Sequence, residues 1–320
     1  MSIIERAVRR LKPMEVVETP PESRLVEIVE HRKTQPTTPT VPSPVAPPLA
    51  PRVAKQTERP VEKSKKRAAP PAVAPVEGPF DTIDLADLES SGMIVPGGKR
   101  TQISEEFRLI KRKLLHNARQ GDSVASRSNN LILVTSAFPN EGKTFSSINL
   151  AISMSLELDH SVLLVDADVA QAGQNDFLGL KPRRGLMDLL LDPEQSLEQT
   201  IIRTNIERLD VLLAGRSHHQ ANELLSSESM TRLLNQLASQ GPDRIVIFDA
   251  PPLLVTTEAG TLAHRAGQVV MVVEAGKTTQ AALKSALGHL EGCSVFGLLN
   301  KSARGPGDGA HEYSRYRYSE

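Results

Sequence analysis

From residue 101 onward, short continuous apolar runs alternate with stretches in which apolar residues recur every three or four positions. The apolar runs are bounded by turn-forming residues and are typical of strands buried on both faces of a sheet. The stretches between them, such as 103–120 and 228–240, are typical of amphipathic helices. This alternation predicts an α/β fold: a parallel sheet with helices on both faces and ligand-binding residues just after the strands. The expected strands lie in 130–136, 161–168, 208–215, 243–252, 267–276 and 294–301.

The chain before this pattern has a different composition. Residues 1–33 include the basic stretch SIIERAVRRLK, whose apolar residues share one helical face, so we expect short helical segments there. Such a helix suits a membrane surface or a partner, and the alternative is a helix packed on its own domain. Proline-rich residues 34–79 are predicted to form a disordered linker. One folded domain is predicted over 80–303 and a flexible tail over 304–320.

Charge and cysteine content narrow the choice of partners. Lys plus Arg and Asp plus Glu number 38 each, so the formal net charge is zero and no bulk field attracts nucleic acid. The single cysteine, Cys293, excludes an internal disulfide and suits a reducing compartment, where we expect a packed thiol. No apolar run approaches the ~18 residues of a membrane-spanning helix. We therefore expect a cytoplasmic protein without a nucleic-acid partner, whose membrane contact is peripheral or made through a partner.

The segment after the first strand has the order of a phosphate-binding loop. A strand, the loop in SAFPNEGKTF (136–145) and a helix follow one another, as in a P-loop. Backbone N–H groups and the helix N-terminus are expected to wrap the phosphates of a nucleotide. The nucleotide-binding residues expected here are Asn140, Glu141, Gly142, Lys143, Thr144 and Phe145.

Two side chains of this loop are expected to act directly. Lys143 would neutralise the β- and γ-phosphates and would be a surface cation in the nucleotide-free protein. The Thr144 hydroxyl would ligate Mg²⁺. The standard pattern has glycine where this chain has Ala137, so the loop is a variant.

Two further strands end in carboxylates. Asp166 and Asp168 close LLVDAD, and alternation places them on the same side of an extended strand. Asp249 closes VIFD. A single strand-end aspartate is more often a helix cap or turn former, but three of them in one phosphate-binding sheet indicate a cation site. We expect Asp168 and Asp249 to join Thr144 around Mg²⁺.

With these motifs the chain resembles a known family. TSAFPNEGKT, LLVDAD and IVIFDAPP resemble the Walker A, Walker A′ and Walker B motifs of the bacterial tyrosine kinases (BY-kinases), P-loop NTPase-like proteins. The two ends of the chain resemble, more loosely, the autokinases of exosortase-linked exopolysaccharide loci. The resemblance implies transfer of phosphate from ATP to tyrosine, with Lys143 catalytic and Asp166 or Asp168 orienting or deprotonating the phenol. It also implies that Asn300 contacts adenine, although a turn-forming role is open.

The helix in EEFRLIKRKL resembles the one through which subunits of that family associate. Glu105, Arg108 and Lys111 follow its E-x-x-R-x-x-R pattern, with Lys111 in place of the last arginine and without its planar fork. The resemblance implies a homo-oligomer. It also implies a separate membrane subunit, a chain-length determinant, because related systems fuse or recruit one and this chain shows no spanning run.

Two alternative functions use the same fold. MinD/ParA-like ATPases carry a second lysine early in the loop, and Phe138 occupies that position here, which argues against them. The other alternative is a nucleotide-gated scaffold of a polysaccharide export complex, which the intact Lys143 and aspartates disfavour.

The three tyrosines of the chain, Tyr313, Tyr316 and Tyr318, all lie in its last eight residues. They alternate with arginines after a glycine-rich stretch, so the segment is expected to be a flexible tether without an apolar face. We predict that a neighbouring subunit phosphorylates all three. Each phosphate would add about −1.5 to −2 charges and favour smaller assemblies.

Overall fold

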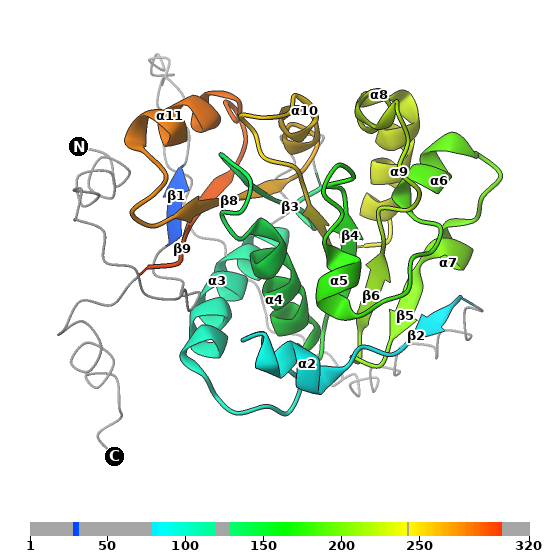
Figure 1. Cartoon of the computed structure of the whole chain (residues 1–320), viewed down its shortest axis with the longest axis horizontal. Helices are drawn as coiled ribbons and strands as arrows, with labels where there is room; N and C mark the ends of the chain where they lie inside the picture. The colour runs from blue at the N-terminus through cyan, green and yellow to red at the C-terminus, as the bar shows by residue number, and fades with distance from the viewer. Residues whose placement is uncertain (1–27, 32–77, 120–127, 242, 303–320) are drawn as a thin grey trace, which may run out of the picture. The chain divides into compact units, whose positions relative to one another are not determined.

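The structure, a computed structural model, describes residues 28–31, 78–119, 128–241 and 243–302. In these residues nine strands form one sheet in the order β1-β9-β8-β3-β7-β4-β6-β5-β2 (Figure 1). The strands are β1 (Ile28–His31), β2 (Phe80–Asp81), β3 (Leu131–Ser136), β4 (Ser161–Asp166), β5 (Ile202–Thr204), β6 (Leu209–Leu212), β7 (Arg244–Asp249), β8 (Gln268–Glu274) and β9 (Val295–Asn300).

The strands from β9 to β6 in sheet order run parallel to one another. Strand β1 pairs antiparallel with β9 at one end of the sheet. At the other end β5 pairs antiparallel with β6, and β2 is parallel to β5. The carboxyl ends of the parallel strands therefore meet at one edge, where an α/β sheet binds its ligands.

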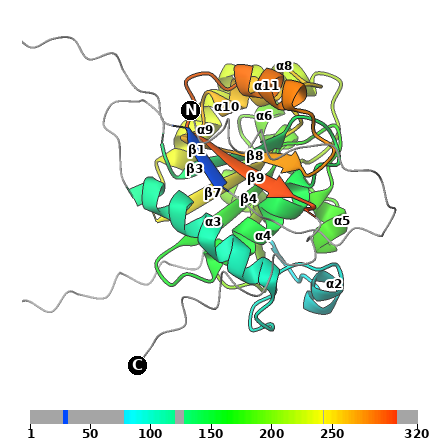
Figure 2. The same ribbon diagram turned by 90° about the vertical axis from the view of Figure 1, so that its left-hand side faces the viewer.

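Helices cover both faces of this sheet (Figures 1 and 2). They are α2 (Leu85–Ser90), α3 (Gln102–Arg119), α4 (Lys143–Ser155), α5 (Gln174–Leu178), α6 (Leu186–Leu191), α7 (Leu197–Thr200), α8 (Ala221–Ser226), α9 (Glu228–Ala238), α10 (Glu258–Ala263) and α11 (Gln280–Gly288). In Figure 2, α3 and α4 lie below the sheet, and α10 and α11 lie above it.

Alternate residues of each central strand enter different cores, as β3 illustrates. Ile132 and Val134 join α3 and α4 in one cluster of buried side chains. Leu131 and Leu133 join α9 and α10 in the other. Because both faces are covered, every residue of β3 is buried, which explains why the strand is apolar throughout.

The predicted α/β fold is confirmed. The six apolar runs correspond to strands β3, β4, β6, β7, β8 and β9, and the expected helices correspond to α3, α4, α9 and α11. The sequence pattern did not reveal the short elements, such as β2, β5 and the helices from α5 to α8. Elements of two to six residues are too short to display a helical or strand period.

The sequence predicted helical segments over 1–33, but the residues that the structure describes in this range form strand β1. Ile28–His31 are extended and pair with Val295–Leu298 of β9. Adjacent β-branched residues Ile28 and Val29 favour a strand over a helix. This strand joins the sheet from outside the predicted 80–303 domain.

Several expectations fall on residues outside the described ranges. They are the basic helix near the N-terminus, nearly all of the 34–79 linker and the 304–320 tail. Among the described residues, no helix combines the length and the apolar character needed to cross a membrane.

Candidate active site

The predicted phosphate-binding loop lies at the carboxyl edge of the central strands. Strand β3 lies between β7 and β8, and its last residue, Ser136, leads into the loop. Helix α4 begins directly after the loop, at Lys143. The first turn of a helix has N–H groups without intrahelical partners and a partial positive charge, so this end of α4 is suited to bind phosphate.

The loop backbone contains two residues in the left-handed region. Asn140 has φ 65° and Gly142 has φ 92°. A Cβ atom at Gly142 would also collide with the side-chain nitrogen Nδ2 of Asn300. Glycine is therefore required at position 142 for two independent reasons, the sign of φ and the close approach of Asn300.

Lys143 is not the surface cation that the sequence predicted. Its side chain is buried, and its Nζ lies 2.7 Å from Oδ2 of Asp168. Because α4 begins at the edge where β4 ends, the first residue of the helix faces the carboxylate that follows this strand. Lys143 is thus paired with the buried carboxylate of Asp168.

Two more carboxylates are buried beside this pair. Asp166 ends β4, Asp249 ends β7, and the two are directly paired in register. Backbone N–H groups of Asp168 and Gln174 donate to the Asp166 carboxylate over 3.2 and 3.4 Å. Strand β4 ends at Asp166, so Asp168 reaches the site from the following loop and not from an extended strand.

Burial changes the ionisation of both strand-end carboxyls. Burial, and then the charge of Asp249, raise the pKa of Asp166 well above its usual value. Burial also raises the pKa of Asp249 to about 6, although Thr144 and Lys143 oppose the shift. The cluster contains three carboxyl groups and one lysine, and a cation bound there would favour the ionised form of these carboxyls.

The side chains at this edge fit a magnesium ion. Neither oxygen of Asp249 has a hydrogen-bond partner within the described residues, although the Thr144 hydroxyl is near enough to lower its pKa. In the described part of the chain, no group of three or more His, Cys, Asp or Glu side chains could hold a metal alone. This donor set suits Mg²⁺, which is usually bound by one or two carboxylates together with substrate phosphates.

Asn300 is fully buried at the end of β9 and supports the loop. Its Nδ2 donates to the carbonyl oxygen of Glu141 over 2.9 Å, and its Oδ1 accepts from the N–H of Lys301. The structure therefore gives Asn300 a loop-supporting role, and the adenine contact stays a prediction.

Gln174 is a site residue that sequence reasoning missed. It is the first residue of α5, it is fully buried, and its side chain lowers the pKa of Asp249. No motif marks it, because its position depends on how the chain turns after Asp168.

The predicted subunit-contact residues do not share one exposed face. Glu105 and Arg108 form an exposed ion pair of 3.4 Å on α3. Lys111 is buried instead, with its Nζ 2.7 Å from both the carbonyl oxygen of Ser153 and the carboxylate of Glu157. It lies in the apolar stripe of α3 that packs on α4, so it binds its own domain and is not free for a neighbour.

Comparisons with known proteins identify the family of this chain. A family model described as an AAA domain matches residues 138–291. Tyrosine-protein kinase YwqD of Bacillus subtilis (strain 168) is 30% identical over 218 residues, which cover 67% of this chain and 85% of that protein. The chain belongs to the bacterial tyrosine kinase family.

Other comparisons give the family context. Succinoglycan biosynthesis transport protein ExoP of Rhizobium meliloti (strain 1021) is 30% identical over 250 residues, covering 74% of this chain and 30% of that protein. The crystal structure of the chimerical protein CapA2B2 matches with 26% identity and a TM-score of 0.56, covering 71% of this chain and 95% of that chain. The chain spans about a quarter of the length of several other curated relatives in the bacterial tyrosine kinase family.

Proposed function

We propose that the chain is an ATP-dependent protein-tyrosine kinase whose catalytic domain spans residues 80–303. The observation that carries the proposal is the buried Lys143–Asp168 pair, set among Asp166 and Asp249 at a helix N-terminus. Phosphoryl transfer requires positioning and neutralisation of charge more than covalent chemistry from the protein. Membership in the tyrosine kinase family supports this choice of reaction.

The loop and α4 are proposed to bind the triphosphate of ATP. N–H groups from Asn140 to Phe145 would bind the phosphate oxygens, and the Lys143 ammonium would turn from Asp168 toward the β- and γ-phosphates. Thr144, Asp168 and Asp249 would hold Mg²⁺, which when bound offsets the negative charge of the phosphate oxygens. Asp249 and Thr144 lie together at this edge, and Asp168 becomes available when Lys143 turns to the phosphates.

In the proposed transfer, the phenolic oxygen of a tyrosine bonds to the γ-phosphorus. The bond from that phosphorus to the oxygen bridging the β- and γ-phosphates breaks, and ADP leaves with its electron pair. The phenolic proton passes to the carboxylate of Asp166 or Asp168 and later to solvent. The substitutions Asp166→Asn and Asp168→Asn, compared in single-turnover transfer, distinguish the two candidate bases.

We propose that the acceptors are Tyr313, Tyr316 and Tyr318 of a neighbouring copy. They are the chain's three tyrosines, and the described part of the chain ends at Ser302, two residues after the strand that supports the phosphate-binding loop. Ten residues lie between Ser302 and Tyr313, so the distance between these two residues can reach about 36–40 Å in an extended chain. Glu105 and Arg108, which are exposed on α3, are proposed to contribute to the contact between copies.

The context of the reaction is proposed from similarity. ExoP is named for succinoglycan biosynthesis and transport. We propose that this kinase regulates the synthesis or export of an exopolysaccharide from the cytoplasmic side of the inner membrane. Its partner there would be a separate membrane subunit that determines chain length.

A mixing experiment tests whether the chain transfers phosphate to tyrosine and whether the transfer occurs between copies. A Lys143→Met chain, which has intact tyrosines, is incubated with labelled ATP, Mg²⁺ and an active chain whose three tyrosines are phenylalanine. Mass spectrometry should then find phosphotyrosine on the Lys143→Met tail. If the wild-type chain alone gives no phosphotyrosine, the proposed kinase activity is wrong. If the wild type is labelled and the mixture is not, only transfer between copies is wrong.

A further inference from the structure

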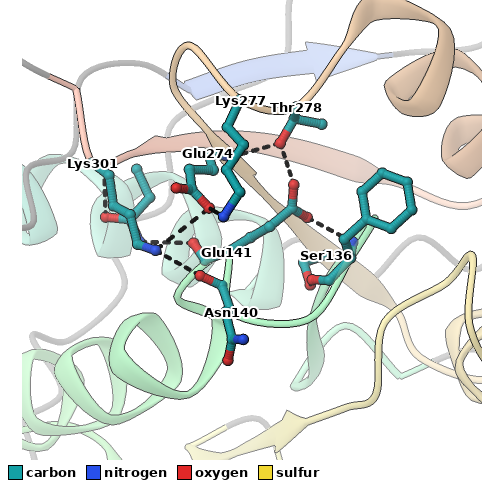
Figure 3. Close-up of polar contacts among 9 residues, drawn as sticks. Ser136, Asn140, Glu141, Glu274, Lys277, Thr278 and Lys301 are labelled. Carbon is teal, nitrogen blue, oxygen red and sulfur yellow. Dashed lines mark hydrogen bonds and ion pairs between the residues drawn. The ribbon is translucent and has the colours of Figure 1, made fainter. Parts of the chain in front are cut away.

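The phosphate-binding loop is held by side chains from two other segments (Figure 3). Glu141 is buried within the loop, and one of its carboxylate oxygens, Oε1, accepts a hydrogen bond from the Thr278 hydroxyl. The other oxygen, Oε2, accepts from the backbone N–H of Phe138 over 2.9 Å. Thr278 is itself buried, and its hydroxyl oxygen accepts from the N–H of Glu274 over 3.1 Å. The carboxylate of Glu141 thus joins the start of the loop to the segment after β8.

A lysine makes the second connection. Lys301, directly after β9, donates from Nζ to the carbonyl oxygen of Asn140 over 2.6 Å. The same Nζ lies 3.4 Å from the carboxylate of Glu274 at the end of β8. Lys277 contacts this carboxylate as well, at 3.3 Å, but its side chain is 69% exposed and makes no hydrogen bond to the loop among the contacts of the described residues.

These contacts fall on the part of the loop with an unusual backbone. Asn140 and Gly142 are both left-handed, and they flank Glu141. A non-glycine residue in that region carries strain that persists only when its surroundings fix it. Ala137 stands where the standard loop has its first glycine. Side-chain contacts to Glu141 and Asn140 hold this loop in addition to Gly142.

We infer that Thr278 and Lys301 are positioning residues that hold the loop from Phe138 to Gly142 in the form that binds nucleotide phosphates. The inference rests on the proposed function, because it concerns the same nucleotide site. Neither side chain needs to touch the nucleotide. Each acts through a loop residue, Thr278 through Glu141 and Lys301 through Asn140.

This role is separable from the stability of the fold. Strands β8 and β9 are joined by their own hydrogen-bond ladder, and β8 also pairs with β3. The contacts of Thr278 and Lys301 with Glu141 and Asn140 end on the loop and not in the hydrophobic core. Removing them should therefore change nucleotide binding by more than it changes global unfolding.

Four variants of the full chain test the inference. Thr278→Val keeps the shape but removes the hydroxyl, and Thr278→Ser restores it. Lys301→Met removes the ammonium that binds Asn140. Lys277→Met is the matched control, because it removes an equal charge from the same Glu274 without removing a contact to the loop.

Affinity is measured by titration with fluorescently labelled ADP and Mg²⁺, and global stability by urea unfolding. Thr278→Val should bind about ten- to a hundredfold more weakly, because a buried charged acceptor loses its donor. Thr278→Ser should stay within about threefold of the wild type. Lys301→Met should lose about three- to tenfold, since the lysine is partly exposed, and Lys277→Met less than about twofold.

The outcomes separate this inference from the proposed function. Wild-type affinity in both Thr278→Val and Lys301→Met would overturn the inference alone. Equal losses of affinity in Thr278→Ser and Thr278→Val would also overturn it, because they would indicate packing in place of a hydrogen bond. Equal losses of affinity in Lys301→Met and Lys277→Met would overturn it as well. Absence of nucleotide binding by the wild type would overturn the proposed function and this inference with it. If Thr278→Val lowers the urea midpoint, its loss of affinity no longer tests the inference by itself. The comparison of nucleotide affinity between Lys301→Met and Lys277→Met then decides whether the inference holds.

Discussion

Replacement of Lys143 by methionine should destabilise the nucleotide-free protein as well as abolish nucleotide-dependent activity. Methionine keeps the aliphatic length of the side chain and removes the ammonium. The Lys143 and Asp168 side chains are only 7% and 2% exposed, and their charged atoms are 2.7 Å apart. The substitution therefore leaves the Asp168 carboxylate buried without its cation, close to Asp166 and Asp249.

The magnitude follows from this burial. Removing one partner of a buried ion pair costs about 3–5 kcal/mol, because the remaining charge is left uncompensated. In a domain of this size, 1 kcal/mol corresponds to a change of about 2–4 °C in Tm, so we expect a decrease of about 6–20 °C. Adding Asp168→Asn to Lys143→Met should recover much of the lost stability, since the uncompensated charge is then gone.

Urea unfolding followed by far-ultraviolet circular dichroism is the suitable assay, because the chain has no tryptophan to report by fluorescence. The buffer contains neither nucleotide nor Mg²⁺, so that ligand binding does not mask the loss. An unchanged urea midpoint for Lys143→Met would refute the reasoning. A double variant no more stable than Lys143→Met would show that the cost does not come from the isolated carboxylate.

Three further predictions concern other contacts. Lys111→Met should lower the free energy of unfolding by about 1–3 kcal/mol because Glu157 and a buried carbonyl lose their donor, which urea unfolding would detect. Replacing Glu105 and Arg108 together by alanine should change stability by less than about 0.5 kcal/mol, because the pair is exposed, yet weaken self-association in sedimentation; identical mass distributions would contradict the proposed contact. The pKa of Asp188 lies below its usual value. Burial by itself would raise this pKa, but hydrogen bonds from two backbone N–H groups and a guanidinium outweigh the effect of burial. The stabilisation of the folded state by ionised Asp188 is therefore present above pH ~4 and is lost as the pH falls. Asp188→Asn should lower the urea midpoint at pH 7, and its midpoint should match that of the wild type more closely near pH 3.

The apolar pattern was sufficient to predict the main strands because each of them is buried on both faces. Such strands are marked in sequence by their lack of polar residues, and the carboxylates that end them mark the ligand edge. The short elements between Gln174 and Ser226 carry no such mark. Their positions depend on packing against the sheet and not on a period of their own.

Two lysines show why the candidate site was predicted only in part. The burial of Lys143 depends on Asp168, 25 positions later in the chain, and no local pattern indicates that pairing. Lys111 is different, because a signal was present: Phe107, Lys111 and Leu115 follow a four-residue spacing along the buried stripe of α3. In the same stretch, the charged E-x-x-R-x-x-R spacing overlaps that stripe at Lys111. The contact between Glu141 and Thr278 joins residues 137 positions apart and had no counterpart in any motif.

The pairing of β1 with β9 bears on the solubility of shortened forms of this protein. Residues 28–31 occupy the hydrogen-bonding groups along one side of β9. A chain shortened to begin at residue 80 would keep the phosphate-binding loop and its carboxylates but would leave that side of β9 unpaired. An unpaired strand edge is a template for the strand of another molecule. Self-association of such a shortened chain would then arise from the exposed edge of β9 and not from the contact between subunits of the full chain. The two kinds of association must be distinguished before the oligomeric state of any fragment is interpreted.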